Sequence, residues 1–146
     1  MKDFYVDWRL VGDNIEIILF AAGVLVATSA YLLQNFTLSP YLKYKNTVGD
    51  VRAKLRMHAN VFGNNVKESK AQAALDDFRE LSCELERNYY AIAARWLLAF
   101  WLPKDDAIRD VCGRLTRLSN SAFDMNKDVA ASCRKDIQVI KALLKI

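Results

Sequence analysis

Hydrophobic and polar positions divide this chain into one continuous apolar stretch followed by a series of amphipathic segments. No residue between Ile17 and Leu33 is charged, and beyond Leu33 the apolar run extends to Phe36 with only Gln34 and Asn35 interrupting. About 20 apolar residues are enough for a helix to cross a bilayer core of roughly 30 Å, and a helix satisfies its own backbone hydrogen bonds there. The pattern predicts a transmembrane helix over residues 14–36. A buried core helix is the weaker alternative, because helices of small soluble domains usually keep a polar face.

Four segments with apolar positions at helical spacing follow. Ser39 and Pro40 are a favourable N-cap and first residue for the first of them, which we expect to end near Gly63. The others are expected over residues 66–92, 104–121 and 124–144. Short connections between them favour an antiparallel arrangement. We therefore predict an all-α fold with one N-terminal transmembrane helix, followed by a cytoplasmic four-helix bundle over residues 39–146.

Charged residues are distributed unevenly around the apolar stretch. Residues 1–16 contain two basic and four acidic side chains, whereas the remainder contains 19 basic and 13 acidic ones. The basic residues that follow the stretch most closely are Lys43, Lys45, Arg52, Lys54 and Arg56. Because basic flanks stay in the cytoplasm, we expect a single-pass membrane protein. Residues 1–13 would form an extracytoplasmic segment, and the C-terminal domain would be cytoplasmic.

The same basic residues are suited to anionic surfaces. Each basic side chain near an anionic lipid surface contributes about 1 kcal/mol of binding free energy. RNA is the lesser alternative, because the exposed aromatic residues that support binding of single-stranded nucleic acid are not interleaved with them. A cleaved signal peptide is also less favoured, since the leading segment is acidic rather than basic.

Small and polar residues recur along the apolar stretch with a period near 3.5. They are Glu16, Gly23, Ala27, Ala30 and Gln34. Small side chains let helices approach closely in lipid, and polar side chains can form hydrogen bonds across the contact. This stripe predicts self-association into a homo-oligomer. Packing of the span against its own cytoplasmic domain is the alternative.

A short apolar segment, residues 96–102, precedes Pro103 and is too short to cross a bilayer. Its aromatic residues Trp96, Phe100 and Trp101 make it an interface candidate. One interpretation is a plug that covers one end of the helical core. The other is an exposed aromatic loop, which would require a partner such as the inner leaflet or another subunit.

Candidate chemistry is sparse. A single histidine, His58, excludes metal sites and dyads that need several histidines, and the three cysteines form no C-x-x-C pair. We expect reduced core thiols, no metal and no cofactor. Arg52 and His58 match the loose Arg-x5-His pattern of HEPN-type ribonucleases. In that family, arginine stabilises charge and histidine moves a proton. The favoured alternative is a hydrogen-bonded histidine in the helical interior, and hence no enzyme.

In layout the chain resembles a widespread family of small single-span bacterial inner-membrane proteins. The resemblance rests on residues 55–64, on residues 102–106 and on residues 115–121. More distantly, the chain is similar to the membrane accessory proteins encoded beside type VI-B CRISPR effectors, which form ring-shaped pores that strengthen antiphage defence. This similarity implies a homo-oligomeric, pore-forming membrane protein in antiphage defence. The alternatives are a membrane-tethered adaptor that recruits a cytoplasmic partner and a HEPN-like ribonuclease.

Overall fold

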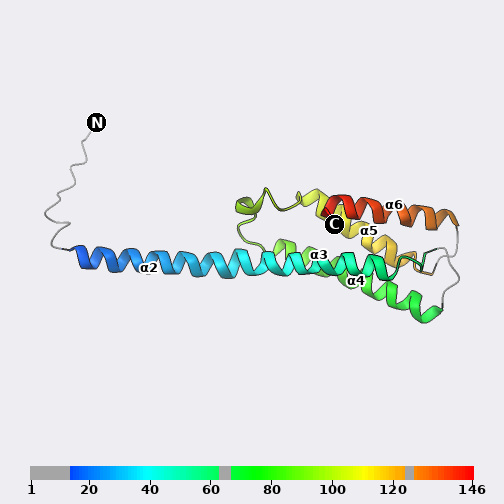
Figure 1. Ribbon diagram of the computed structural model, residues 1–146, viewed down its shortest axis with the longest axis horizontal. Coiled ribbons are helices and arrows are strands. Elements are labelled where there is room, and N and C mark those ends of the chain that lie inside the picture. Colours follow the sequence, from blue (N-terminus) through cyan, green and yellow to red (C-terminus); the bar gives the residue numbers. More distant parts are fainter. Residues whose placement is uncertain (1–13, 63–66, 124–126) are drawn as a thin grey trace, which may run out of the picture.

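The structure, a computed structural model, describes residues 14–62, 67–123 and 127–146 (Figure 1). Over these residues it contains helices and no strand, which confirms the all-α prediction. In chain order the elements are α2 (Ile15–Leu33), the π-helical turn η1 (Gln34–Leu38), α3 (Ser39–Met57), α4 (Glu68–Tyr90), the 3-10 turn η2 (Arg95–Leu98), α5 (Asp105–Asn120) and α6 (Lys127–Leu144). The predicted extracytoplasmic segment, residues 1–13, lies outside the described residues.

The first three elements form one continuous helix of 43 residues, Ile15–Met57. The prediction that Ser39 caps a new helix is therefore wrong. Ser39 has helical backbone angles (φ −62°, ψ −48°), and its amide donates to the carbonyl of Gln34, five residues earlier. In a regular α-helix the Pro40 ring would clash with a preceding carbonyl. The wider π-helical turn before Pro40 allows the helix to continue through it.

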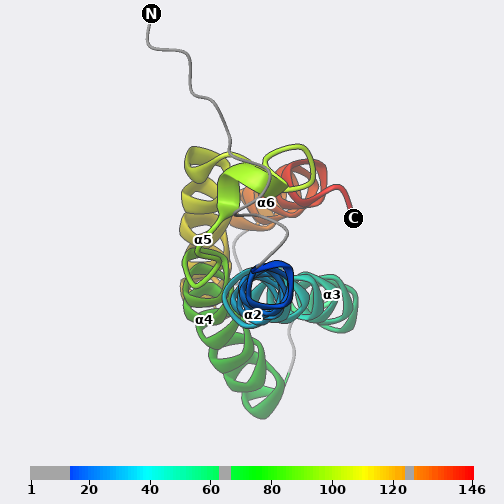
Figure 2. The same ribbon diagram turned by 90° about the vertical axis from the view of Figure 1, so that its left-hand side faces the viewer.

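The N-terminal half of this helix is uncovered. No residue of α2 is buried, and α2 extends beyond the other helices in Figure 1 and is seen end-on in Figure 2. In the part of the chain that the structure describes, this is the one helix long and apolar enough to cross a membrane. Exposed apolar surface is unfavourable in water, so an apolar environment around α2 would stabilise it.

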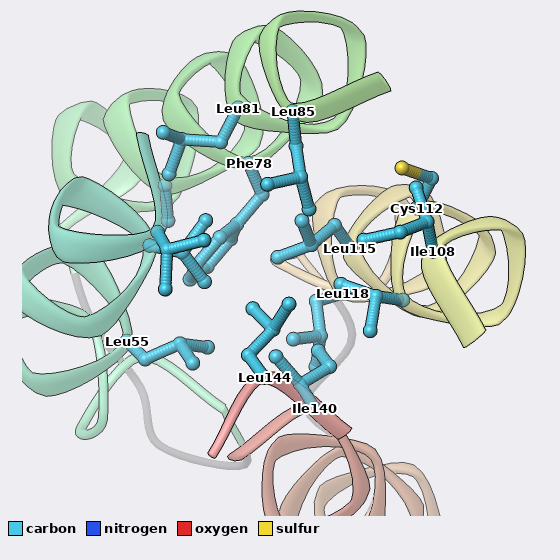
Figure 3. Close-up of a cluster of buried hydrophobic side chains, with 14 of the residues drawn as sticks. Leu55, Phe78, Leu81, Leu85, Ile108, Cys112, Leu115, Leu118, Ile140 and Leu144 are labelled. Carbon is cyan, nitrogen blue, oxygen red and sulfur yellow. The ribbon is translucent and has the colours of Figure 1, made fainter. Parts of the chain in front are cut away.

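The remaining helices fold back on one another. Starting from α2, α3 runs away, α4 returns, α5 runs away again and α6 returns (Figure 1). α4 packs against both α3 and α5, and α6 packs against α5. Their apolar side chains meet in one core, to which each helix contributes (Figure 3). Fully buried examples are Val51, Phe78, Leu85, Leu115 and Ile140.

The helix ends differ modestly from those predicted. α3 ends at Met57 rather than near Gly63, because His58 leaves helical geometry (φ −96°, ψ 9°). Val61 and Phe62 follow in turns and are buried in the core. α5 begins one residue later than predicted, with Asp105 in its first turn near the positive end of the helix dipole. Residues 124–126 of the last predicted helix lie outside the described residues.

Candidate functional site

The α2–α3 junction is tied to the connection between α4 and α5. The amide of Ala93 donates a 2.9 Å hydrogen bond to the carbonyl oxygen of Phe36. In a regular α-helix that carbonyl would accept from residue 40, but Pro40 has no amide hydrogen. The missing amide of Pro40 therefore leaves the Phe36 carbonyl available to the connection between α4 and α5, residues 91–104, which we call the loop.

The base of the loop is fixed by aromatic and charged side chains. The Tyr89 hydroxyl lies 2.7 Å from a carboxylate oxygen of Asp105 and 2.8 Å from the carbonyl oxygen of Pro103. Burial, and then the contact with Asp105, raise the pKa of Tyr89 above its usual range, so the hydroxyl stays protonated and can donate. The Arg95 guanidinium lies over the rings of Tyr89 and Tyr90, 5.4 Å and 5.0 Å from their centres. The contacts of Tyr89 with Pro103 and Asp105 join the end of α4, where the loop begins, to the start of α5, where it ends.

The loop presents its aromatic side chains outward. Trp96, Phe100 and Trp101 are 77%, 94% and 68% exposed, and Leu97 beside them is 44% exposed. We call these four residues the aromatic tip. Only Leu98 of the segment is buried. A core plug would bury the rings, so the geometry favours the exposed-loop interpretation.

All five residues of the predicted stripe, Glu16, Gly23, Ala27, Ala30 and Gln34, are exposed on α2 and η1. Around Gly23 there is open space. The alternative in which the span packs against its own domain is not what the structure contains, since no α2 residue is buried.

The stripe continues onto α3. Ala30 and Gln34 line the same shallow hollow as Leu38 and Leu42. Gly49, seven residues beyond Leu42, lies on the same helix face and again has open space around it. The core-facing residues of α3 are Tyr44, Val48, Val51 and Leu55. The small-residue face is thus directed away from the protein's own core along the whole helix.

The basic residues after the apolar stretch have different environments. Lys43, Lys45, Arg52 and Arg56 are exposed. Lys54 is half-buried, and its ammonium lies 2.8 Å from a carboxylate oxygen of Asp77. Only the exposed four remain available to an anionic surface in the way the sequence predicted.

His58 belongs to a buried polar network. Its side chain is 6% exposed, and its Nε2 lies 2.6 Å from Oδ2 of Asp77. Its ring contacts Phe78 edge-to-face, with ring centres 5.5 Å apart. Burial opposes ionisation of Asp77, but hydrogen bonds from Lys54 and His58 outweigh it and lower the pKa of that carboxyl. The ionised carboxylate accepts from both partners.

Arg52 and His58, the candidate nuclease pair, are not brought together within the protein. Arg52 is exposed, whereas His58 points into the helical interior. The sequence analysis did not identify Asp77 as the partner of His58. The available signal was that a polar residue on an apolar face needs a hydrogen-bonding partner when buried.

Other chemistry is limited in the described ranges. They contain no group of three or more His, Cys, Asp or Glu side chains placed to hold a metal ion. The three cysteines form no disulfide. Cys112 and Cys133 are buried, as expected of core thiols, whereas Cys83 is exposed. Burial raises the pKa of Cys112 to about 11, which keeps its thiol protonated and unreactive.

Comparison with known proteins gives no match: no family model, no curated protein and no solved structure is similar to this chain.

Proposed function

We propose that this is a single-pass membrane protein whose α2 helix crosses the bilayer and whose helices α3–α6 form a cytoplasmic module joined to it without a flexible linker. The observation that carries the proposal is the continuous helix Ile15–Met57, whose apolar half is uncovered. Burying apolar surface contributes about 25 cal/mol per Å², so lipid around α2 stabilises this arrangement.

The proposed orientation places the N-terminus outside and the module in the cytoplasm. It is supported by exposed Lys43 and Lys45 shortly after the apolar stretch. Cys83, the exposed cysteine of α4, provides a native probe. In spheroplasts a membrane-impermeant maleimide should leave Cys83 unmodified until the membrane is permeabilised. Modification in intact spheroplasts would reverse the orientation.

We further propose that the protein acts as a homo-oligomer assembled through the stripe of α2 and its continuation on α3. Support comes from the exposure of Gly23, Ala27 and Ala30, and of Gly49 on the same face. Close approach of two helix backbones needs such small residues. A parallel pairing of two copies would align both parts of the stripe at once.

The assembly is tested by Gly23→Ile, with Ala21→Ile as the matched control. Ala21 is also exposed in α2, but two helical positions place it on nearly the opposite face. Mass photometry in mild detergent should find oligomers for the native protein and Ala21→Ile, and monomers for Gly23→Ile. A monomeric native protein, or one bound to a stoichiometric soluble partner, would instead support the membrane-tethered adaptor.

A pore is the more specific form of this proposal. If the stripe lines the centre of a ring, Glu16 and Gln34 face the lumen near its two ends and give a mild cation preference. The role in antiphage defence implied by resemblance belongs to this form. Ion flux through vesicles containing the purified protein, reduced by Glu16→Gln, would support it, and closed vesicles would restrict the function to a scaffold.

We do not extend the proposal to a ribonuclease. His58 forms a hydrogen bond to Asp77 in the interior of its own protomer, and Arg52 is exposed elsewhere. RNA cleavage that is lost in both Arg52→Ala and His58→Ala, with folding retained, would restore the enzyme hypothesis.

A further inference from the structure

Among the residues that the structure describes outside α2, the aromatic tip is a dense cluster of exposed apolar side chains. Its residues Trp96, Leu97, Phe100 and Trp101 follow one another within a single short connection, and Phe100 is 94% exposed. Contiguous exposed apolar patches of this kind mark sites of interaction.

The position of the tip is set by the fold. Ala93, three residues before Trp96, is hydrogen-bonded to Phe36 in η1, where the apolar stretch of the long helix ends. The loop lies at the end of the module from which α2 emerges (Figure 1). If α2 crosses a bilayer, the tip is therefore held at the depth of the cytoplasmic headgroups.

The loop has a stable internal geometry. Within it, the amide of Leu97 donates to the carbonyl of Ala94, and the amides of Trp101 and Leu102 donate to the carbonyl of Leu98. The ion pair between Arg95 and Asp105, at 3.8 Å, joins its start to the beginning of α5. The rings are thus presented by a structured turn.

Basic side chains surround the tip. Trp101 lines one small hollow together with Lys45 of α3 and Lys145 after α6. Lys104 is also exposed and lines a second hollow together with Trp96. Aromatic rings beside lysines match the lipid interface, where rings occupy the boundary region and ammonium groups meet anionic headgroups.

We propose that the aromatic tip inserts into the cytoplasmic leaflet of the bilayer that α2 crosses, as a second membrane attachment. This inference rests on the proposed function. The module then contacts lipid at two places, the helix and the loop, and these two contacts fix the orientation of the module toward the membrane.

The test uses the full chain reconstituted in phosphatidylcholine–phosphatidylglycerol vesicles, with brominated phosphatidylcholine as the quencher. The chain contains three tryptophans, so the variant Trp8→Phe, Trp101→Phe leaves Trp96 as the sole reporter. We expect Trp96 to lose most of its fluorescence emission in brominated vesicles. Its emission maximum in vesicles should lie at a shorter wavelength than in the protein unfolded without detergent.

The matched control moves the reporter to the other end of the module. Phe123 is 45% exposed and follows the C-terminal end of α5, which is the end of that helix remote from α2 (Figure 1). In the variant Trp8→Phe, Trp96→Phe, Trp101→Phe, Phe123→Trp, emission should be equal in brominated and ordinary vesicles. Circular dichroism checks that both variants keep their helix content.

Flotation with the vesicles after carbonate extraction separates the two proposals. Protein that floats with Trp96 quenched and residue 123 unquenched supports the second attachment. Protein that floats with Trp96 unquenched overturns it while the membrane span stands. A blue-shifted but unquenched Trp96 also overturns it, and indicates that the tip contacts protein. Protein that is extracted by carbonate overturns both proposals.

Discussion

The amide of Ala93 donates a 2.9 Å hydrogen bond to the carbonyl oxygen of Phe36. This contact joins a loop to the middle of a long helix, at the carbonyl that Pro40 cannot satisfy. It relates the two exposed apolar features, α2 and the aromatic tip, through one backbone contact. The geometry of this junction can be tested independently of any function.

Replacing Pro40 with alanine should loosen the loop. The new amide would compete for the Phe36 carbonyl, as in a regular α-helix, and displace Ala93. A lost hydrogen bond worth about 1 kcal/mol corresponds to roughly fivefold faster amide exchange at Ala93, measured by hydrogen exchange and mass spectrometry. Ser39→Ala, which adds no donor, is the control and should leave the exchange rate unchanged. Equal rates in both variants would contradict the role of Pro40.

Loss of the Asp77 carboxylate should destabilise the module. In Asp77→Ala the buried His58 loses its partner, and an unsatisfied buried polar group costs about 1–3 kcal/mol of unfolding free energy. Urea unfolding in detergent micelles, followed by circular dichroism, measures this change. Asp76→Ala is the control, because Asp76 is exposed and accepts hydrogen bonds from the exposed side chain of Gln72. Its effect should be within about 0.5 kcal/mol.

The contribution of Asp77 should also depend on pH. Its pKa in the folded protein is lowered by Lys54 and His58, so the stabilisation is complete above the unfolded value of about 3.9. It is lost as the pH falls through the lower, folded-state pKa. The difference in unfolding free energy between the native protein and Asp77→Asn should thus be constant near neutrality and should narrow below about pH 4. A difference that widens on acidification would reverse this assignment.

Removing the carboxylate of Asp136 in α6 should lower the unfolding free energy more than removing that of Asp110 in α5. Asp136 is 2% exposed and is paired with Arg114 and Arg117 of α5. Asp136→Ala removes a buried acceptor. However, Arg114 keeps Asp110 and Arg117 is 62% exposed, so we expect a cost of about 2 kcal/mol of unfolding free energy. The control Asp110→Ala removes the exposed partner of Arg114 and should cost only about 0.5 kcal/mol. Similar values for the two variants in urea unfolding would contradict a buried link between α5 and α6.

The three cysteines should react in two classes. Cys83 is exposed, whereas Cys112 and Cys133 are buried. The pKa of Cys112 is raised to about 11 by burial, so its reactive thiolate is scarce at pH 8. Intact-mass spectrometry after maleimide treatment should find one modification in the folded protein and three after urea unfolding. Rapid modification of all three would indicate that the core opens readily.

Local signals were sufficient for the helices that carry them clearly. For α5, acidic residues at the start and a regular apolar period place both ends within one residue of those observed. At Ser39 and Pro40 the same kind of local signal was misleading. A Ser-Pro pair is typical of a helix start, but here the helix continues through a π-helical turn, with Ala93 bonded to its Phe36 carbonyl. That contact comes from a distant part of the chain, and residue spacing does not reveal it.

The candidate site, too, was predictable from the sequence only where the signal lies within one segment of the chain. Period and composition were enough to select the stripe and the aromatic residues 96–101, since both depend on side-chain type along one segment. The pairing of His58 with Asp77 was missed because it depends on how α3 and α4 are rotated toward each other. A carboxylate beside the core residue Phe78 looks solvent-exposed by periodicity alone, yet it reaches back to a neighbouring helix.

The unbroken helix Ile15–Met57 has a mechanical consequence. α3 contains 19 residues, and at 1.5 Å per residue it extends about 28 Å beyond the junction. A change in tilt of α2 by about 10° would therefore move the far end of α3 by roughly 5 Å. If α2 crosses a bilayer, a change in membrane thickness that tilts α2 would move the remote end of the module by a similar amount, because α2 and α3 have 19 residues each and meet at one rigid junction.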